Sequence, residues 1–230
     1  EYGPEAYDAI KKEGEALAEA GTWLESTVIE KCDLIREAKR KGTRIHLGDL
    51  LTLCSIKFFE KDRKFWKWKG RICFRGDNVR DEDGALAVFQ EMSSSPTAVH
   101  SANANISYGC FPGNKSTVSD AIRAYIQSLL KSKHKTWVHI PKDLQPPNWK
   151  GQYTKPMCLL VKALYGHPES GGHWERHLTE AILKIGGEPI PTHPSSFWFD
   201  KTKMLLTVYV DDLLLSGPDA GHAPTWAALK

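Results

Sequence analysis

The sequence predicts an α+β fold, and two kinds of pattern support this prediction. Some segments combine helix-favouring residues with an apolar period of three to four, as in Pro4–Ala20 and His173–Ile185. Other segments are β-branched and aromatic runs interrupted by a bend, as in Leu53–Arg75 and Met204–Ser216. With 230 residues, the chain is long enough for one large domain or two small ones, each with its own core.

The composition is that of an ordinary globular protein. The net charge of +3 suits a nucleic-acid groove but is far below that of a histone-like protein. The five cysteines are scattered and never form a Cys-x-x-Cys pair, so we expect reduced thiols in an intracellular protein. No apolar run has membrane-spanning length, so no membrane partner is expected. The N-terminus is polar and acidic, without the apolar region of a signal peptide. The chain opens on Glu1 with no initiator methionine, which favours a fragment, and processing is the alternative.

The first half of the chain is expected to hold helices on either side of a hairpin. The predicted helices are Pro4–Ala20, Thr27–Arg40, Asp81–Met92 and Thr97–Tyr108. The second arm of the hairpin, Phe65–Arg75, interleaves basic residues with tryptophans, which suits phosphates and unpaired bases. The alternative is an amphipathic strand whose cations are simply solvated.

The second half is expected to supply short strands and one long helix. The predicted strands are Trp137–Ile140, Cys158–Lys162 and Ser196–Phe199, and the predicted helix is His173–Ile185. Asp120 follows a β-prone run, so it is expected on a strand beside the last hairpin. It is equally suited to cap a helix over 121–130.

The last hairpin, Met204–Ser216, carries Asp211 and Asp212 at its bend. Carboxylates between apolar flanks lose hydration, which raises their pKa unless a cation offsets the cost. A divalent metal ion is therefore the expected partner. The alternative is that the two aspartates only make the turn, since aspartate is a common turn residue.

Three stretches resemble the motifs of one enzyme family. Tyr209–Asp212 resembles the Tyr-x-Asp-Asp box of reverse transcriptases, and Asp120–Ile126 resembles their first carboxylate motif, Asp-x-x-x-Ala-aromatic-aliphatic. The most specific stretch is Leu160–Trp174, LVKALYGHPESGGHW. It is similar to the Lys-Ala-Leu-Tyr-Gly-x-x-x-Ser-x-x-x-Trp signature of copia-type (Pseudoviridae-like) LTR retrotransposon reverse transcriptases. The family has Leu-Lys-Gln-Ser-Pro-Arg-Ala after the glycine, whereas this chain has HPESGGH.

This resemblance implies an RNA-dependent DNA polymerase with reverse-transcriptase-like fingers and palm. The palm would be an antiparallel sheet with helices packed on one face, and the thumb and ribonuclease H would be missing after the Tyr-x-Asp-Asp box. Residues 1–118 would form N-terminal helices and fingers. Residues 119–230 would form the palm with the family's A, B and C motifs and a fingers-like insertion around 137–170.

The resemblance also implies the partners and the site. The partners would be an RNA or DNA template with its primer, deoxynucleoside triphosphates, and a larger polyprotein with integrase and ribonuclease H. The location would be a cytoplasmic particle or the nucleus. The catalytic residues would be Asp120, Asp211 and Asp212, which would bind two Mg²⁺ ions, with Mn²⁺ as a substitute. The nucleotide-binding residues would be Lys69 and Arg71 for the triphosphate, Tyr125 as steric gate, and Tyr165 and Gly166 in the pocket.

Other functions stay open at this point. A catalytically inactive retrotransposon remnant would at most bind nucleic acid through the basic arm. An unrelated metal-dependent phosphoesterase would hydrolyse nucleotides without a primer. Tyr125 is also suited to be a core aromatic residue. His167, His173 and His177 form a competing metal-ligand set, although they lack the His-Glu-x-x-His order of zinc hydrolases.

Overall fold

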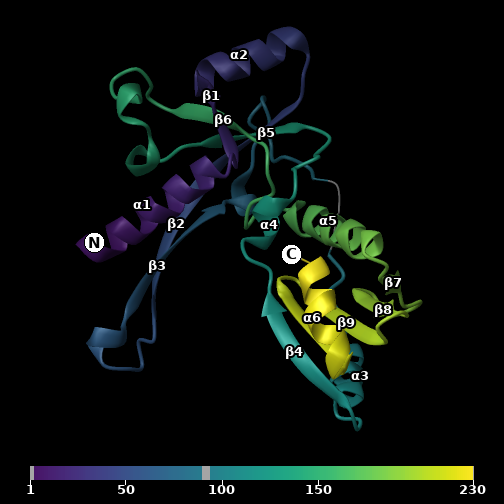
Figure 1. Cartoon of the computed structure of the whole chain (residues 1–230). Coiled ribbons are helices and arrows are strands. Elements are labelled where there is room, and N and C mark those ends of the chain that lie inside the picture. Colours follow the sequence, from purple (N-terminus) through teal and green to yellow (C-terminus); the bar gives the residue numbers. More distant parts are fainter. Residues whose placement is uncertain (1–2, 90–93, 230) are drawn as a thin grey trace. The chain divides into compact units, whose positions relative to one another are not determined.

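The structure is a computed structural model that describes residues 3–89 and 94–229 (Figure 1). The chain forms two compact units, and each combines helices with a five-stranded sheet. The first unit contains the described residues of 3–89 and 129–170, and the second contains 94–128 and 171–229. The α+β prediction is therefore confirmed.

The first unit is a mixed sheet with helices on it. Its strand order is β1-β6-β5-β2-β3, in which only β2 and β5 run parallel. The elements are α1 (Pro4–Glu19), β1 (Trp23–Glu30), α2 (Lys31–Lys41), β2 (Ile45–Lys57), β3 (Lys67–Phe74), β5 (Lys135–His139) and β6 (Pro156–Leu160). Short 3₁₀ turns lie at Arg63–Phe65, Gly76–Asn78, Lys142–Leu144 and Pro147–Trp149.

Two helix predictions in this unit fail, one at its start and the other over all of its described residues. The helix expected at Thr27–Arg40 begins only at Lys31, because β-branched residues before it extend β1 instead. The Thr27 hydroxyl accepts a hydrogen bond from the Leu159 N–H at 3.0 Å and ties this strand to β6. The helix expected at Asp81–Met92 is absent over 81–89, where the Asp81 carboxylate accepts backbone N–H groups and stabilises a turn. Residues 90–92 lie outside the described residues.

The predicted hairpin is present, and its first strand begins earlier than expected. β2 and β3 pair in register from Leu50 opposite Phe74 to Lys57 opposite Lys67, and Figure 1 shows them as a projecting arm of the first unit. Helix α1 packs closely on β3, because a Cβ on Gly70 would come within 2.3 Å of the Ala9 carbonyl oxygen. Gly70 therefore lets the arm and α1 approach each other.

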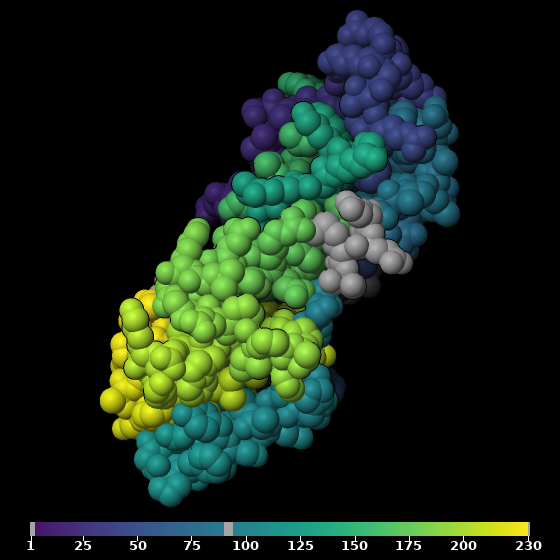
Figure 2. Space-filling view, turned by 90° about the vertical axis from the view of Figure 1, so that its right-hand side faces the viewer, coloured from purple at the N-terminus to yellow at the C-terminus, as the bar shows by residue number. Residues whose placement is uncertain are grey.

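The second unit is a fully antiparallel sheet in the order β4-β10-β9-β8-β7. Its strands are β4 (Asn114–Asp120), β7 (Glu188–Pro189), β8 (Ser196–Phe199), β9 (Met204–Tyr209) and β10 (Asp212–Pro218). Its helices are α3 (Val99–Gly109), α4 (Ala124–Gln127), α5 (Ser170–Lys184) and α6 (Asp219–Ala228). On the face seen in Figure 2, α5 and the β7–β8 segment form a continuous surface. The hairpin predicted at Met204–Ser216 is confirmed.

Helices cover both faces of this sheet, so the expectation of helices on one face is wrong. One face packs Ile182 of α5 against Leu206 and Leu215 in an apolar core. Side chains alternate along a strand, so Thr207 faces the other way, where the Asn105 amide of α3 donates to its hydroxyl at 2.9 Å. The buried positions of α3 are small or polar, namely Ser101, Asn105 and Gly109. They allow this helix to approach the sheet closely.

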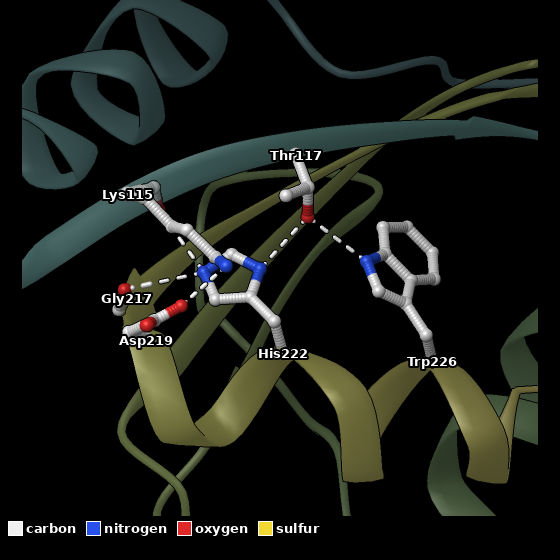
Figure 3. A network of polar contacts seen from close by, with 6 residues as sticks. All are labelled: Lys115, Thr117, Gly217, Asp219, His222 and Trp226. Atoms are coloured by element: carbon white, nitrogen blue, oxygen red, sulfur yellow. Dashed lines mark hydrogen bonds and ion pairs between the residues drawn. The ribbon is translucent and has the colours of Figure 1, made fainter.

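Helix α6 is joined to the edge strand β4 by a partly buried polar network around the buried His222 ring (Figure 3). The Thr117 hydroxyl lies 2.7 Å from His222 Nδ1 and accepts the Trp226 indole N–H at 2.9 Å. His222 Nε2 lies 3.1 Å from the Lys115 carbonyl oxygen and 3.2 Å from that of Gly217. These bonds fix α6 against β4 and β10, the two strands that carry Asp120 and Asp212.

The contacts divide the chain differently from the domain boundary expected at residue 118. They assign α3 and all of β4 to the second unit, because α3 packs on β10 and β4 pairs along β10. The expected functional division into fingers and palm stays a prediction. Within 3–89 and 94–229, no helix is long and apolar enough to cross a membrane.

Candidate active site

The strand register of the second unit brings Asp120 next to the Asp-Asp hairpin. β4 and β10 are antiparallel neighbours, and Asp120 lies directly opposite Asp212. β4 ends at Asp120, and the next helix, α4, begins only at Ala124. The alternative that Asp120 caps a helix over 121–130 is therefore wrong. Two carboxylates from segments distant in sequence thus meet at one end of the sheet.

The hairpin that carries Asp211 has an unusual turn. Tyr209 pairs with Asp212, so Val210 and Asp211 are the two turn residues. Val210 has a φ of 59°, a left-handed value that is an outlier for a β-branched residue. Tight hairpin turns normally place glycine or asparagine where φ is positive. The bend is therefore not a turn that the residue types alone would favour.

Two tertiary hydrogen bonds hold the carbonyl groups of this turn. The Ala121 N–H donates to the Asp211 carbonyl oxygen at 2.7 Å, and the Trp174 indole N–H donates to the Val210 carbonyl oxygen at 2.7 Å. Trp174 belongs to α5 and is only 3% exposed. Sequence reasoning used Trp174 as part of a signature and missed this contact, since only the fold brings α5 to the turn.

The carboxylates perturb one another electrostatically. Partial desolvation, then the charges of Asp211 and Asp120 and a hydrogen bond with the Asp120 carboxyl, raise the pKa of the Asp212 carboxyl. The desolvation is modest because Asp120 and Asp212 are exposed and Asp211 is half-buried. The site thus carries negative charge that a bound cation would stabilise.

The donor set fits a hard divalent cation in its chemistry. Carboxylate oxygens are the preferred ligands of Mg²⁺ and Mn²⁺, and the mutual repulsion at Asp212 would be relieved by a cation. Among the described residues, no group of three or more histidine, cysteine, aspartate or glutamate side chains has the geometry of a metal site. Asp120, Asp211 and Asp212 are therefore not arranged as a ready three-carboxylate site in this structure, and their joint binding of a cation is a proposal.

A groove with a volume of about 520 Å³ opens beside Asp120 in the second unit. Apolar side chains from α5, α6 and β10 form much of its lining, including Trp174, Trp226 and Leu213. Polar groups at its rim include Gln127 and His177. The carboxylate end of the sheet is thus next to a space large enough for a small organic ligand.

Tyr125, the expected steric gate, also belongs to the second unit. It lies half-buried in the short helix α4, a little beyond Asp120 in the chain. Its carbonyl oxygen accepts hydrogen bonds from the N–H and the hydroxyl of Ser128. Its place near the end of β4 is compatible with either the gate or the core interpretation.

The other expected nucleotide-binding residues belong to the first unit. Lys69 lies opposite Ser55 and Arg71 opposite Leu53 in the β2–β3 arm, and both side chains fall on the same face of β3. Tyr165 is 48% exposed, and its carbonyl oxygen accepts the Phe74 N–H at 2.6 Å. The structure therefore sets Asp120 opposite Asp212 and next to the turn that carries Asp211, whereas Lys69, Arg71, Tyr165 and Gly166 belong to the first unit.

Local packing explains part of the Lys-Ala-Leu-Tyr-Gly signature. Gly166 has a φ of +87°, and a Cβ there would lie 2.1 Å from the Phe74 carbonyl oxygen. The Ser170 hydroxyl closes the same loop through the backbone of Leu164, which it contacts at both N–H and carbonyl oxygen. The family-departing Glu169 is buried and accepts a hydrogen bond from the Ser132 hydroxyl. The geometry of this loop thus explains Gly166, Ser170 and Glu169 without a bound nucleotide.

The competing histidine set gains no support from the structure. His167 lies in the first unit, where its Nε2 is 3.2 Å from the Thr136 hydroxyl and its Nδ1 accepts the Glu169 N–H. His173 and His177 lie on α5 in the second unit. The His177 ring packs beside Trp174, with ring centroids 6.0 Å apart.

Neither a scan against protein-family models nor a search of curated proteins finds a match to this chain. Membership of a family is therefore a proposal that rests on the motifs and on the geometry of the three aspartates.

Proposed function

We propose that this chain is the polymerase portion of a copia-type reverse transcriptase. The reaction is template-directed attack of a primer 3′-hydroxyl on the α-phosphate of a deoxynucleoside triphosphate, with pyrophosphate as the leaving group. The observation that carries the proposal is the β4–β10 register, which sets Asp120 opposite Asp212 and beside the Asp211 turn. Two-metal nucleotidyl transfer needs clustered carboxylates of this kind.

The aspartates supply the charge that the reaction requires. Asp120, Asp211 and Asp212 would hold the divalent cations, which lower the pKa of the attacking hydroxyl and neutralise the triphosphate when bound. The raised pKa of Asp212 supports this role, because its causes, partial desolvation and then the charges of Asp211 and Asp120, both disfavour an unpaired carboxylate and are offset by a bound cation. The exposure of Asp120 and Asp212 leaves room for substrate oxygens to complete the coordination.

The nucleotide contacts are proposed from the motifs. Arg71 and Lys69 bind triphosphate oxygens, since a guanidinium holds phosphate in a bidentate geometry and an ammonium adds a point charge. Tyr125 excludes a ribose 2′-hydroxyl by bulk. Tyr165 and Gly166 line the base pocket, in addition to the loop packing described above. Base choice comes from pairing with the template.

The test is single-turnover extension of a labelled primer on an RNA template with Mg²⁺ or Mn²⁺. The wild-type chain is expected to add the templated nucleotide, and Asp211→Asn to lose this activity while still binding the primer-template. Asp49→Asn makes the same chemical change on the first unit and serves as the matched control. Absence of incorporation by the wild-type chain with either cation would overturn the proposal, and full activity of Asp211→Asn would overturn the metal assignment.

A second candidate function, nucleic-acid binding without catalysis, is favoured by the tip of the β2–β3 arm. Phe59 is 68% and Phe65 51% exposed there, which is unusual for phenylalanine. Lys61 lies 4.8 Å from the Phe58 ring centroid, and Lys64 lies 5.1 Å from that of Phe65. Exposed rings beside ammonium groups suit the bases and phosphates of a single strand.

Salt-dependent binding to an unstructured oligonucleotide measures this second function. Phe59→Ala is expected to weaken binding several-fold, because stacking contributes about 1–3 kcal/mol per base. Val88→Ala removes another exposed apolar side chain of the same unit, away from the arm, and is the control. Binding that is equally strong in both variants would exclude the tip as the contact.

A further inference from the structure

The turn between β9 and β10 holds a conformation that its own residues do not favour. A β-branched residue at positive φ is strained and persists only where surrounding contacts impose that conformation. Val210, at φ 59°, immediately precedes Asp211. Whatever imposes this conformation therefore also sets where the neighbouring carboxylates lie.

Side-chain packing alone does not fix the turn. Val210 lines a small cavity of about 20 Å³ together with Trp174, Leu178 and Val208. That volume is about the space of one water molecule, and Val210 itself is only half-buried, so its side chain is not fully enclosed. The restraint must come from the backbone of the turn.

The backbone restraint on Val210 comes from α5. The Trp174 indole N–H donates to the Val210 carbonyl oxygen at 2.7 Å and thereby orients the peptide that joins Val210 to Asp211. The indole is 3% exposed and packs beside the carboxylate end of the sheet, so water cannot easily replace this donor. The Asp211 carbonyl oxygen is held separately by the Ala121 N–H, directly after Asp120 in the chain.

We infer that Trp174 is a positioning residue for the cation site, acting through its indole N–H on the strained Val210 peptide. Trp174 does not touch the reacting groups; it keeps the turn in the form in which Asp212 lies opposite Asp120 and Asp211 lies beside it. The inference rests on the proposed function for its relevance to catalysis. Its structural content, that an indole N–H controls divalent-cation affinity, is tested without any polymerase reaction.

The test is Mn²⁺ binding to the full chain, measured by electron paramagnetic resonance without nucleic acid or nucleotide. Trp174→Phe is expected to weaken Mn²⁺ binding roughly tenfold, which corresponds to the loss of one buried hydrogen bond to the turn. Replacement of Trp174 by benzothienylalanine removes the N–H and keeps the shape of the ring system. The benzothienylalanine variant is also expected to bind Mn²⁺ roughly tenfold more weakly. It keeps the inference testable if Trp174→Phe does not fold.

Trp198 provides a control in the same unit. Its indole N–H donates to the Asp200 carboxylate at 3.4 Å, and Trp198 pairs with Leu205, at the other end of β9 from the turn. Trp198→Phe also removes an indole N–H donor and is expected to leave Mn²⁺ affinity within about twofold. Equal loss of Mn²⁺ affinity in both tryptophan variants would show that the effect does not act through the turn and would overturn the inference.

A double-mutant cycle identifies the route of the effect. Glycine adopts positive φ without strain, so Val210→Gly removes the need for an imposed conformation. In that background Trp174→Phe is expected to change Mn²⁺ affinity by less than about threefold, which gives a clear coupling between the two positions. An undiminished tenfold effect would exclude action through the Val210 peptide.

The outcomes separate this inference from the proposed function. Mn²⁺ binding by the wild-type chain that is unchanged in Trp174→Phe and in the benzothienylalanine variant overturns the inference alone. A Trp174-dependent Mn²⁺ site in a chain that incorporates no nucleotide supports the inference and overturns the polymerase proposal. A wild-type chain that binds no Mn²⁺ overturns both.

Discussion

Two aspartate environments, one in each unit, show opposite ways of keeping a carboxylate at a sheet. Asp49 on β2 lies 3.5 Å from His139 Nδ1 and 3.2 Å from the Lys155 ammonium. The hydrogen bond from His139, together with Lys155, holds the pKa of the Asp49 carboxyl well below its usual range. Asp212 instead meets Asp120 and Asp211, and its pKa is raised.

The difference shows how a structural carboxylate is distinguished from a candidate ligand. Asp49 accepts a hydrogen bond from His139 and lies beside the Lys155 ammonium, so its charge contributes to stability. The negative charge of Asp212 is disfavoured by partial desolvation and by the charges of Asp211 and Asp120, so the ionised form lowers the free energy of unfolding. A raised carboxyl pKa of this kind is typical of catalytic and ligand-binding sites.

The largest expected effect is on catalysis. Asp120→Asn should reduce Mg²⁺-dependent nucleotide incorporation by about 10³-fold, because a metal ligand contributes several kcal/mol and each 1.36 kcal/mol is a factor of ten. Asp49→Asn should stay close to wild type. Single-turnover primer extension compares the two. Equal losses would mean that the contrast between the two environments has no functional meaning.

A smaller effect is expected on stability in the absence of divalent cations, and its sign should differ between the two positions. Asp49→Asn should lower the free energy of unfolding by about 1 kcal/mol, allowing for solvent screening of a partly exposed group. Asp212→Asn should raise it by about 0.3 kcal/mol, because one like charge is removed at an exposed site. Urea unfolding at neutral pH measures both. A loss of stability in Asp212→Asn would contradict the repulsion described here.

The smallest expected effect is the pH dependence of the two stability changes caused by Asp49→Asn and Asp212→Asn. A lowered folded-state pKa means that the contribution of Asp49 is present above the ordinary aspartate value and is lost as pH falls below about 4. A raised folded-state pKa means that the contribution of Asp212 to the free energy of unfolding is greatest below about pH 4. This contribution falls as the pH rises through the folded-state pKa of Asp212.

The two variants should reveal these opposite trends. The deficit of Asp49→Asn relative to wild type should shrink on acidification, and the gain of Asp212→Asn should appear only as pH rises above about 4. Urea unfolding across a pH series gives both curves. Parallel curves for the two variants would show that the two carboxylates titrate alike.

Local sequence pattern predicted the elements whose residues agree with their environment. The final hairpin, α1, α3, α5 and the β2–β3 arm were predicted because periodicity, bends and residue preference pointed the same way. The local pattern of Thr27–Glu30 favours a helix, and its partner strand β6 lies more than a hundred residues away, where local sequence gives no sign of the pairing. Pairing with a distant strand outweighed the local helical pattern there.

In the candidate site, too, local sequence predicts some features, and others depend on tertiary packing. Asp211 and Asp212 were recognisable from their apolar flanks, and the position of Asp120 on a strand was one of two local possibilities. The positive φ of Val210 and the bond from Trp174 were not predictable, because they depend on how α5 packs against the sheet. The helix α3 on the second face was also missed as a packing element, since its buried positions are small and polar rather than apolar.

The most direct test of the central claim, that Asp120, Asp211 and Asp212 form one divalent-cation site, is a Mn²⁺ titration of the chain without nucleic acid. Electron paramagnetic resonance should show saturable Mn²⁺ binding by wild type and by Asp49→Asn, and its loss in Asp120→Asn. Unchanged Mn²⁺ binding in Asp120→Asn would contradict the claim, because the residue opposite Asp212 would then contribute nothing to the site.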